Sequence, residues 1–158
     1  MKIKIKKLSD NAVMPTKAHP TDAGFDLYAT SRTIDNYGNV VYGTGLAFEI
    51  PEGYAGFLFP RSSNAKMGLL LSNSVGVIDC HYRGEVTMKF KPSLEATAAR
   101  NPRITSFEYF QPDHIHRYSE GERIGQLIIM PIPEVEFEFA NELSETDRGE
   151  GGYGSTGR

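Results

Sequence analysis

The sequence predicts an all-β domain of the barrel or jelly-roll type, because many short apolar segments are separated by frequent Gly and Pro turns. The 158 residues suffice for one domain with its own core. The chain contains no internal repeat and no linker that would divide it into two domains. We therefore expect a single β domain, followed by a tail of different composition.

The strands are predicted from two kinds of pattern. Alternation of apolar and polar residues, typical of half-buried strands, occurs over residues 2–7, 85–91 and 134–139. Continuous apolar runs, which indicate more fully buried strands, cover residues 45–50, 55–59 and 127–130. One short helical turn is expected at residues 63–70, and a second at residues 94–100 inside a Pro-bounded polar stretch.

Composition and charge exclude several classes of protein. Charged residues make up 23% and hydrophobic residues 39% of the chain, which fits neither a disordered nor a membrane protein. No apolar run approaches the roughly 18–20 residues that span a bilayer, and the N-terminus lacks a signal-peptide core. The net charge of −3 argues against binding along a nucleic acid backbone, although a few local cations could still hold a small anion. Cys80 is the only cysteine, so the cytoplasm is the expected compartment, or the host cytoplasm if the protein is viral.

Arg61, Ser62 and Ser63 follow a predicted buried strand and open the predicted helical turn. Two hydroxyls, free backbone N–H groups and a guanidinium could together hold an anion. An ordinary N-cap beside a surface arginine is the simpler alternative.

Residues 73–86 contain two strand-like pieces around residues 80–84, which predicts a hairpin. Asp79 follows the apolar Val77 and Ile78, a setting that could shelter a carboxylate that deprotonates a water. An aspartate that caps a turn is the alternative. Cys80 and His81 are adjacent, and strand geometry points adjacent side chains to opposite faces, so a thiol–imidazole pair is not expected.

Two further groups of polar residues have more than one possible role when judged from the sequence. Arg123 and Gln126 lie beside an apolar strand, where a phosphate, a bound water or a salt bridge could satisfy them. His114 and His116 would share one face of a strand, but no clustered ligands accompany them in a metal site.

Residues 148–158 contain five glycines and almost nothing that could fill a core. A loose tail is the default for such a terminus. As a flap, however, the segment would offer backbone N–H groups and two hydroxyls to phosphate, the charge of Arg148, and the ring of Tyr153 to stack on a base. Its spacing differs from that of a P-loop.

Taken together and in order, five segments resemble the five motifs of the trimeric dUTPases. They are residues 23–29, 60–63, 73–85, 121–126 and 148–157. The third and fifth are the longest and most specific.

The resemblance implies a jelly-roll-like β-barrel subunit of residues 1–147, in a homotrimer that exchanges the C-terminal flaps of residues 148–158. It implies hydrolysis of dUTP to dUMP and pyrophosphate through attack of water on the α-phosphate. That reaction limits uracil in DNA and supplies dUMP for thymidylate synthesis. Mg²⁺ would be the cofactor, held mainly by the substrate phosphates and by Asp26 through a water.

The resemblance also implies residue roles. Asp79 would activate the attacking water, and Gln126 would help to order it. Asn73 and the backbone of residues 76–78 would read uracil, Tyr82 would pack beneath the sugar, and Tyr153 would lie over the base. The substrate-binding set would comprise Arg61, Ser62, Ser63, Asn73, Gly76, Val77, Ile78, Tyr82, Thr87, Arg123, Arg148, Tyr153, Gly154, Ser155 and Thr156.

Two departures and two rival functions accompany the resemblance. Tyr153 stands where phenylalanine is more usual, and residues 92–117 are longer than the family commonly has at that place. Some bacteriophage members carry inserts with regulatory binding roles, so a regulatory protein partner for this insert is a hypothesis. A dCTP deaminase shares the fold, but its usual motifs after the hairpin are absent. A nucleotide-sensing protein that kept the fold would be indicated by a lost Asp79 or flap, and both are present.

Overall fold

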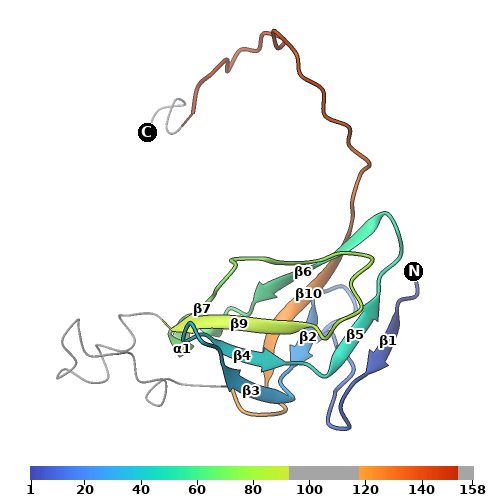
Figure 1. Cartoon of the computed structure of the whole chain (residues 1–158), viewed down its shortest axis with the longest axis vertical. Helices are drawn as coiled ribbons and strands as arrows, with labels where there is room; N and C mark the ends of the chain where they lie inside the picture. The colour runs from blue at the N-terminus through green and yellow to red at the C-terminus, as the bar shows by residue number, and fades with distance from the viewer. Residues whose placement is uncertain (93–117, 153–158) are drawn as a thin grey trace, which may run out of the picture.

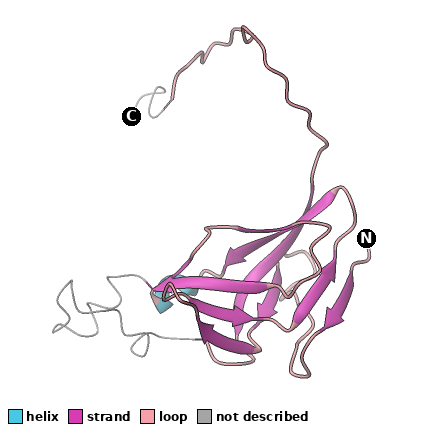
Figure 2. Ribbon diagram, viewed as in Figure 1, coloured by secondary structure: helices cyan, strands magenta, loops and turns pink. Residues whose placement is uncertain are grey.

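The computed structural model describes residues 1–92 and 118–152, and these residues form three antiparallel sheets and one short helix (Figure 1). Two of the sheets have four strands each, in the orders β2–β10–β6–β8 and β3–β4–β9–β7. The third sheet pairs β1 with β5. Strands dominate the compact part of the molecule, as Figure 2 shows, so the predicted all-β class is confirmed.

The first sheet carries several of the predicted site residues and is built around its longest strand, β10. Its members are β2 (Phe25–Tyr28), β10 (Arg123–Pro131), β6 (Tyr54–Pro60) and β8 (Gly76–Ile78). β10 pairs with β2 on one side and with β6 on the other. The apolar runs 55–59 and 127–130 thus become neighbouring strands at the centre of this sheet. Their prediction as strands is confirmed, but the fuller burial expected of them holds only in part, since Met130 is 36% exposed.

The second sheet and the two-stranded sheet complete the barrel. The second sheet contains β3 (Ser31–Ile34), β4 (Val40–Gly43), β9 (Thr87–Pro92) and β7 (Leu69–Leu71). The two-stranded sheet contains β1 (Lys4–Lys7) and β5 (Leu46–Glu49). The alternation predicted for residues 85–91 is confirmed, because exposed and buried residues alternate along the whole of β9.

The core lies between the inner faces of the two four-stranded sheets. Its largest fully buried side chains come from both of them and from the adjoining segments: Tyr42, Phe90, Leu27, Leu46, Leu69, Met88, Ile124, Val40 and Val86. At one point the sheets approach closely, since a Cβ on Gly125 of β10 would collide with the end of the Met88 side chain of β9 and lie 3.0 Å from the Phe59 carbonyl oxygen. Burial of each large apolar side chain stabilises the fold by roughly 1.5–3 kcal/mol.

The predicted helical turn is present as α1 (Asn64–Met67), which ends at Gly68 in the left-handed conformation with φ of 64°. Glycine adopts that conformation without the steric cost of a Cβ. The second predicted turn, at residues 94–100, lies outside the described residues, as do His114 and His116. In the described part of the chain, no helix is long and apolar enough to cross a membrane.

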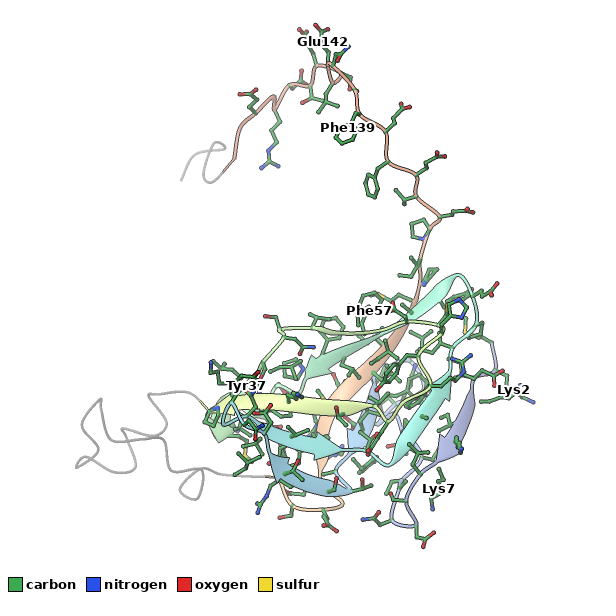
Figure 3. All side chains as sticks on the ribbon, viewed as in Figure 1. Lys2, Lys7, Tyr37, Phe57, Phe139 and Glu142 are labelled. Carbon is green, nitrogen blue, oxygen red and sulfur yellow. The ribbon has the colours of Figure 1, made fainter. Side chains whose placement is uncertain are left out.

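The strand predicted at residues 134–139 is wrong for the isolated chain. Beyond β10 the chain runs away from the barrel as an extended, unpaired arm, on which Figure 3 labels Phe139 and Glu142. Val135, Phe137 and Phe139 are 59%, 93% and 111% exposed. The alternating pattern is real, but no strand in the described part of this chain pairs with it.

The predicted hairpin at residues 73–86 is also wrong as a two-stranded unit. β8 pairs with β6, whereas β9 pairs with β4 and β7. The two pieces therefore belong to different sheets, and residues 79–86 cross from one sheet to the other.

Candidate active site

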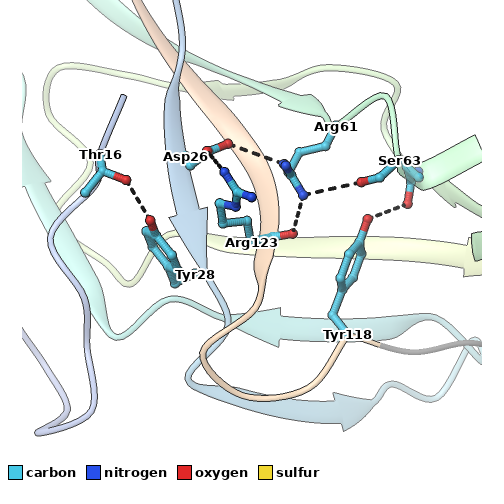
Figure 4. Close-up of polar contacts among 8 residues, drawn as sticks. Thr16, Asp26, Tyr28, Arg61, Ser63, Tyr118 and Arg123 are labelled. Atoms are coloured by element: carbon cyan, nitrogen blue, oxygen red, sulfur yellow. Dashed lines mark hydrogen bonds and ion pairs between the residues drawn. The ribbon is translucent and has the colours of Figure 1, made fainter. Parts of the chain in front are cut away.

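A buried carboxylate between two guanidinium groups lies at one end of the first sheet. Asp26 of β2 is 6% exposed. Its Oδ2 accepts a hydrogen bond from Arg123 Nη1 at 3.1 Å, and its Oδ1 lies 3.4 Å from Arg61 Nε (Figure 4). Arg61 also donates from Nη1 to the Ser63 hydroxyl and to the Arg123 carbonyl, both at 3.4 Å. With one carboxylate and two guanidinium groups, this cluster carries a formal charge of +1, so it is an attractive site for an anion.

A β-bulge explains how Arg123 and Gln126 come to serve the same cluster. Residues three apart on a regular strand point to opposite faces. The register between β10 and β2 shifts between Arg123 and Gly125, so that Arg123 pairs with Tyr28 and Gln126 pairs with Asp26. Such a bulge re-aims the side chain next to it. The period-two pattern of the sequence could not reveal this shift.

Gln126 is held against the chain that enters β2. It is half-buried, and a Cβ on Gly24 would lie 3.1 Å from its Cβ and 3.4 Å from its Oε1. Gly24 therefore allows a close approach that a larger residue would disturb. The sequence motif contained Gly24, but only the packing shows what it does.

Ser62 and Ser63 occupy the turn between β6 and α1. Ser63 is the N-cap residue, yet its side chain makes no capping hydrogen bond, and its backbone is helical with φ of −62° and ψ of −20°. Its hydroxyl instead accepts the hydrogen bond from Arg61. The simple capping alternative for Ser63 is therefore wrong, and the hydroxyl belongs to the cationic cluster.

A second group of predicted residues lines a small open pocket of about 140 Å³. Its lining residues are Val77, Ile78, Asp79, Tyr82, Glu85 and Thr87. Five of these six were predicted from the sequence. Asp79 and Tyr82 are exposed, and Val77 is 57% exposed, so this chain alone does not supply the apolar shelter expected around Asp79.

Short hydrogen bonds fix the backbone of this loop. The Tyr82 hydroxyl donates to the Glu85 carbonyl at 2.9 Å, and the Tyr82 N–H donates to the Asp79 carbonyl at 3.0 Å. The Glu85 carboxylate accepts from the Gly45 N–H at 2.7 Å, which ties the loop to β5. Sequence reasoning missed Glu85, and its only signal was a charged residue at the start of an alternating strand.

Asn73 and the residues after it form the approach to β8. Ser74 is left-handed, with φ of 60°, and Asn73 is exposed. Gly76 is buried, and a Cβ there would lie 3.0 Å from the Leu58 side chain. Because β8 ends the order of its sheet, one of its edges has no strand partner among residues 1–92 and 118–152.

The cationic cluster and the Asp79 pocket lie at opposite ends of β6. Ile78 pairs with Gly56 near the start of β6, and Arg61 directly follows the end of that strand, five residues beyond Gly56. At roughly 3.3 Å per residue the separation is about 17 Å. The predicted site residues of one chain therefore form two groups rather than one.

The C-terminal site residues are described only in part. Arg148 is exposed, and its Nε donates to the Gly151 carbonyl at 2.9 Å. The remaining predicted flap residues lie outside the described residues: Tyr153, Gly154, Ser155 and Thr156.

The described residues of this site offer one carboxylate, Asp26, to a magnesium ion. The described residues contain no group of three or more His, Cys, Asp or Glu side chains that could enclose a metal. Asp26 Oδ1 is buried and receives no hydrogen bond from the described residues, so it retains an acceptor position for a metal-bound water. The donor set thus suits an ion that is held mainly by phosphate oxygens.

The chain resembles known proteins over nearly its whole length. A family model described as dUTPase matches residues 10–98 and 112–157. The chain is 40% identical to the deoxyuridine 5'-triphosphate nucleotidohydrolase of Nautilia profundicola over 161 aligned residues, which cover 100% of both chains.

Solved structures agree with this placement. The dUTPase of Staphylococcus bacteriophage 80alpha with dUPNHPP superposes with a TM-score of 0.78 at 34% identity, covering 99% of each chain. A mutant dUTPase from phage phi11 of S. aureus superposes at 0.68 and 30% identity, covering 90% of this chain and 98% of that one, and is described with a structural Mg(II) ion. Another structure of the phi11 enzyme, which covers 92% of this chain and 100% of that one, is described as visualising a species-specific insert. The two clusters of site residues, the jelly-roll-like sheets and these relatives lead to one conclusion: the chain belongs to the dUTPase family.

Proposed function

We propose that this protein hydrolyses dUTP to dUMP and pyrophosphate, with residues 1–147 as the β-barrel domain and residues 148–158 as a flap. The observation that carries the proposal is the pocket beside Asp79, which gathers five predicted substrate and catalytic residues in one place. The reaction removes dUTP before its uracil enters DNA, and it supplies dUMP for thymidylate synthesis.

Asp79 is the general base in this proposal. Its carboxylate takes a proton from a water, the water oxygen bonds to the α-phosphorus, and the bond to the bridging oxygen of the leaving pyrophosphate breaks. A positioned base of this kind contributes roughly 10²- to 10⁴-fold to a rate. The exposed carboxylate and the adjacent pocket support this role.

The cationic cluster binds the phosphate chain. Arg61 and Arg123, with the Ser62 and Ser63 hydroxyls, stabilise the negative charge that gathers on phosphate oxygens as the bond breaks. Gln126 orders water beside them. Asp26 holds both guanidinium groups in place before substrate arrives, which supports a preorganised site.

Uracil is read by the free edge of β8. Its N3–H donor and carbonyl acceptors match backbone C=O and N–H groups of Gly76, Val77 and Ile78, together with the Asn73 side chain. Cytosine reverses part of that pattern and would leave buried groups unpaired, which permits strong rejection. Tyr82 and Thr87 line the sugar side of the same pocket, where Tyr82 excludes a ribose 2′-hydroxyl.

We propose a homotrimer in which the subunits share their active sites. The separation of about 17 Å along β6 supports this arrangement, because Asp79 and Arg61 of one chain are poorly placed to act on one phosphate chain. Each site then takes its cationic cluster from one subunit and its Asp79 pocket from another.

The exposed arm supports the same assembly. Residues 134–139 present an apolar stripe too large to remain in water at no cost. A matching surface is an apolar groove of about 230 Å³, lined by Ile3, Ile5, Phe25 and Phe48 among others. It lies beside β1, which pairs with β5 along one edge and has no strand partner on its other edge among the described residues. Addition of the arm as a strand to a neighbouring subunit would bury the stripe and carry the flap across to a neighbour's site.

The flap closes the site in this proposal. Tyr153 stacks on the base, while Arg148, Gly154, Ser155 and Thr156 contact the phosphates. Mg²⁺ binds with the substrate, and Asp26 contacts it through a water. When bound, the ion neutralises charge on the phosphate oxygens.

The insert at residues 92–117 is proposed as a contact for a regulatory protein. The family model leaves residues 99–111 unmatched, and the phi11 relative is described with a species-specific insert. The 80alpha enzyme is described as controlling transfer of virulence genes by a G protein-like mechanism. The cytoplasm, or that of a host cell, is the compartment we propose.

Pyrophosphate release across dUTP, dCTP, dTTP and UTP, with and without Mg²⁺, tests the function. We expect pyrophosphate release from dUTP and from none of the other three nucleotides. Release from dUTP should be slow when Mg²⁺ is left out. Ammonia from dCTP would instead indicate a deaminase, and binding of dUTP without turnover would indicate a nucleotide sensor.

A further inference from the structure

Asn64 is a buried amide that connects both ends of the segment around α1. It is 6% exposed, and its Nδ2 donates to the Leu69 carbonyl at 2.6 Å. Its backbone N–H donates to the Arg61 carbonyl at 2.9 Å. A buried amide destabilises a fold unless its polar atoms are hydrogen-bonded, so these contacts fix the orientation of the side chain.

Tyr118 supplies the second contact to this amide. Its hydroxyl donates to Asn64 Oδ1 over a long distance of 3.4 Å, and its backbone N–H donates to the Tyr42 hydroxyl at 3.0 Å. Its ring lies 5.7 Å from that of Tyr42 and 6.1 Å from that of Phe90. Burial raises the pKa of Tyr118, so the hydroxyl keeps its proton and remains a donor at neutral pH.

The turn that Asn64 anchors is the one that carries the phosphate-binding groups. Arg61 contacts the Ser63 hydroxyl and lies 3.4 Å from the Asp26 carboxylate, while Asn64 next to them is buried. The Ser63 hydroxyl makes no capping bond that would hold the turn. Asn64 is a buried polar side chain that ties this turn to the core, and the Tyr118 hydroxyl, which also hydrogen-bonds Ser63, is a second buried polar tie.

We infer that Asn64, oriented by the Tyr118 hydroxyl, is a positioning residue that holds Arg61, Ser62 and Ser63 in register for the β- and γ-phosphates. The inference rests on the proposed function for the identity of the ligand. If Asn64 only stabilised the fold, its substitution would weaken the affinity for every ligand to the same extent. A positioning Asn64 affects ligands in proportion to the phosphates they place on the turn.

Calorimetric binding of dUMP, dUpNHpp and pyrophosphate to N64A and Y118F separates these two roles. We expect the Kd for dUpNHpp and for pyrophosphate to rise about tenfold in N64A and about threefold in Y118F, as loss of one or two buried hydrogen bonds implies. The Kd for dUMP should change less than twofold. Y37F is the matched control, because it also removes a tyrosine hydroxyl but from a residue that is 86% exposed.

A double mutant sharpens the test, because Y118F should add nothing further in an N64A background if the hydroxyl acts through the amide. Equal weakening of all three ligands, or no weakening, would overturn the inference. If N64A does not fold, Y118F decides alone, since it keeps the buried ring. Pyrophosphate binding reports on the turn even if dUTP is not hydrolysed, so failure of this inference is distinguishable from failure of the proposed function.

Discussion

The cationic end of the first sheet and the loop beside Asp79 are built in opposite ways. Asp26, Arg61 and Arg123 are joined by ion pairs around a buried carboxylate. Asp79 and Tyr82 are exposed at a small open pocket, and hydrogen bonds of Tyr82 to the Asp79 and Glu85 carbonyls hold the loop backbone. The phosphate side of the proposed site is therefore nearly complete in one chain, whereas the base and water side requires further surface around it.

The two regions would therefore contribute to the proposed reaction in different ways. A preorganised cluster binds charge without rearrangement, which favours catalysis by electrostatic stabilisation. An open pocket admits the nucleotide and gains its shelter only when another subunit and the flap cover it. The following experiments either break this contrast or make it quantitative.

The largest effect is expected for Asp79→Asn. Loss of the base should lower kcat by about 10³-fold, while the Kd for dUpNHpp stays within about twofold, because the amide keeps the size of the carboxylate. Steady-state kinetics and calorimetry measure both quantities, and D10N on the exposed N-terminal segment is the control. A normal kcat would refute the role of Asp79.

Deletion of residues 148–158 should follow in size. We expect kcat/KM to fall by about 100-fold, since charge and hydroxyl groups on the phosphates are lost and water enters the site. The melting temperature should remain unchanged, because the described contacts of Arg148 and Gly149 are local to the tail. A truncated protein with full activity would show that the tail has no part in catalysis.

Asp26→Asn tests whether the cluster is preassembled. Removal of the charge leaves two guanidinium groups uncompensated and should lower the free energy of unfolding by about 1–2 kcal/mol, a value reduced because both arginines are partly exposed. Asp79→Asn, at an exposed carboxylate, should leave that free energy unchanged. Urea unfolding of the two variants gives the comparison directly, and equal stabilities would contradict it.

The smallest effect concerns the turn that supports the start of the Asn73 segment. Hydrogen bonds from Asn39, and from Lys89 nearby, hold the pKa of Asp35 at about 2, below its ordinary value of 3.8. Asn39 also accepts a hydrogen bond from Ser72 at 3.0 Å. Because the pKa of Asp35 is lowered in the folded state, its carboxylate stabilises the fold at every pH above the ordinary pKa of 3.8. That contribution disappears as the pH falls toward about 2.

Asp35→Asn should therefore lower the melting temperature by a few degrees at pH 7. The difference from the wild-type protein should shrink between about pH 3.8 and pH 2. Thermal melts across that range measure it, with D10N as the reference. A difference that is constant with pH would exclude the carboxylate charge as its cause.

Much of the fold could be predicted because it depends on local pattern. The runs 55–59 and 127–130 became β6 and β10, and the alternation of residues 85–91 became β9. The helical turn after Ser63 was also predictable, since a serine, a residue type common at helix starts, precedes it and Gly68 ends it, although the Ser63 side chain makes no capping bond. In contrast, the partner of a strand is a long-range choice, so the sequence placed β8 and β9 in one hairpin when they pair in different sheets.

Residue types and their order along the chain determined the class of fold and the family, because motifs keep their spacing whatever surrounds them. Tertiary structure decided which side chains meet. A bulge turns Arg123 toward Asp26, and close packing explains Gly24 and Gly125. Asn64 and Tyr118, which no local pattern singled out, come together across 54 residues of sequence. Register, burial and contact at a distance depend on how whole sheets pack, and that information is not present in any short segment.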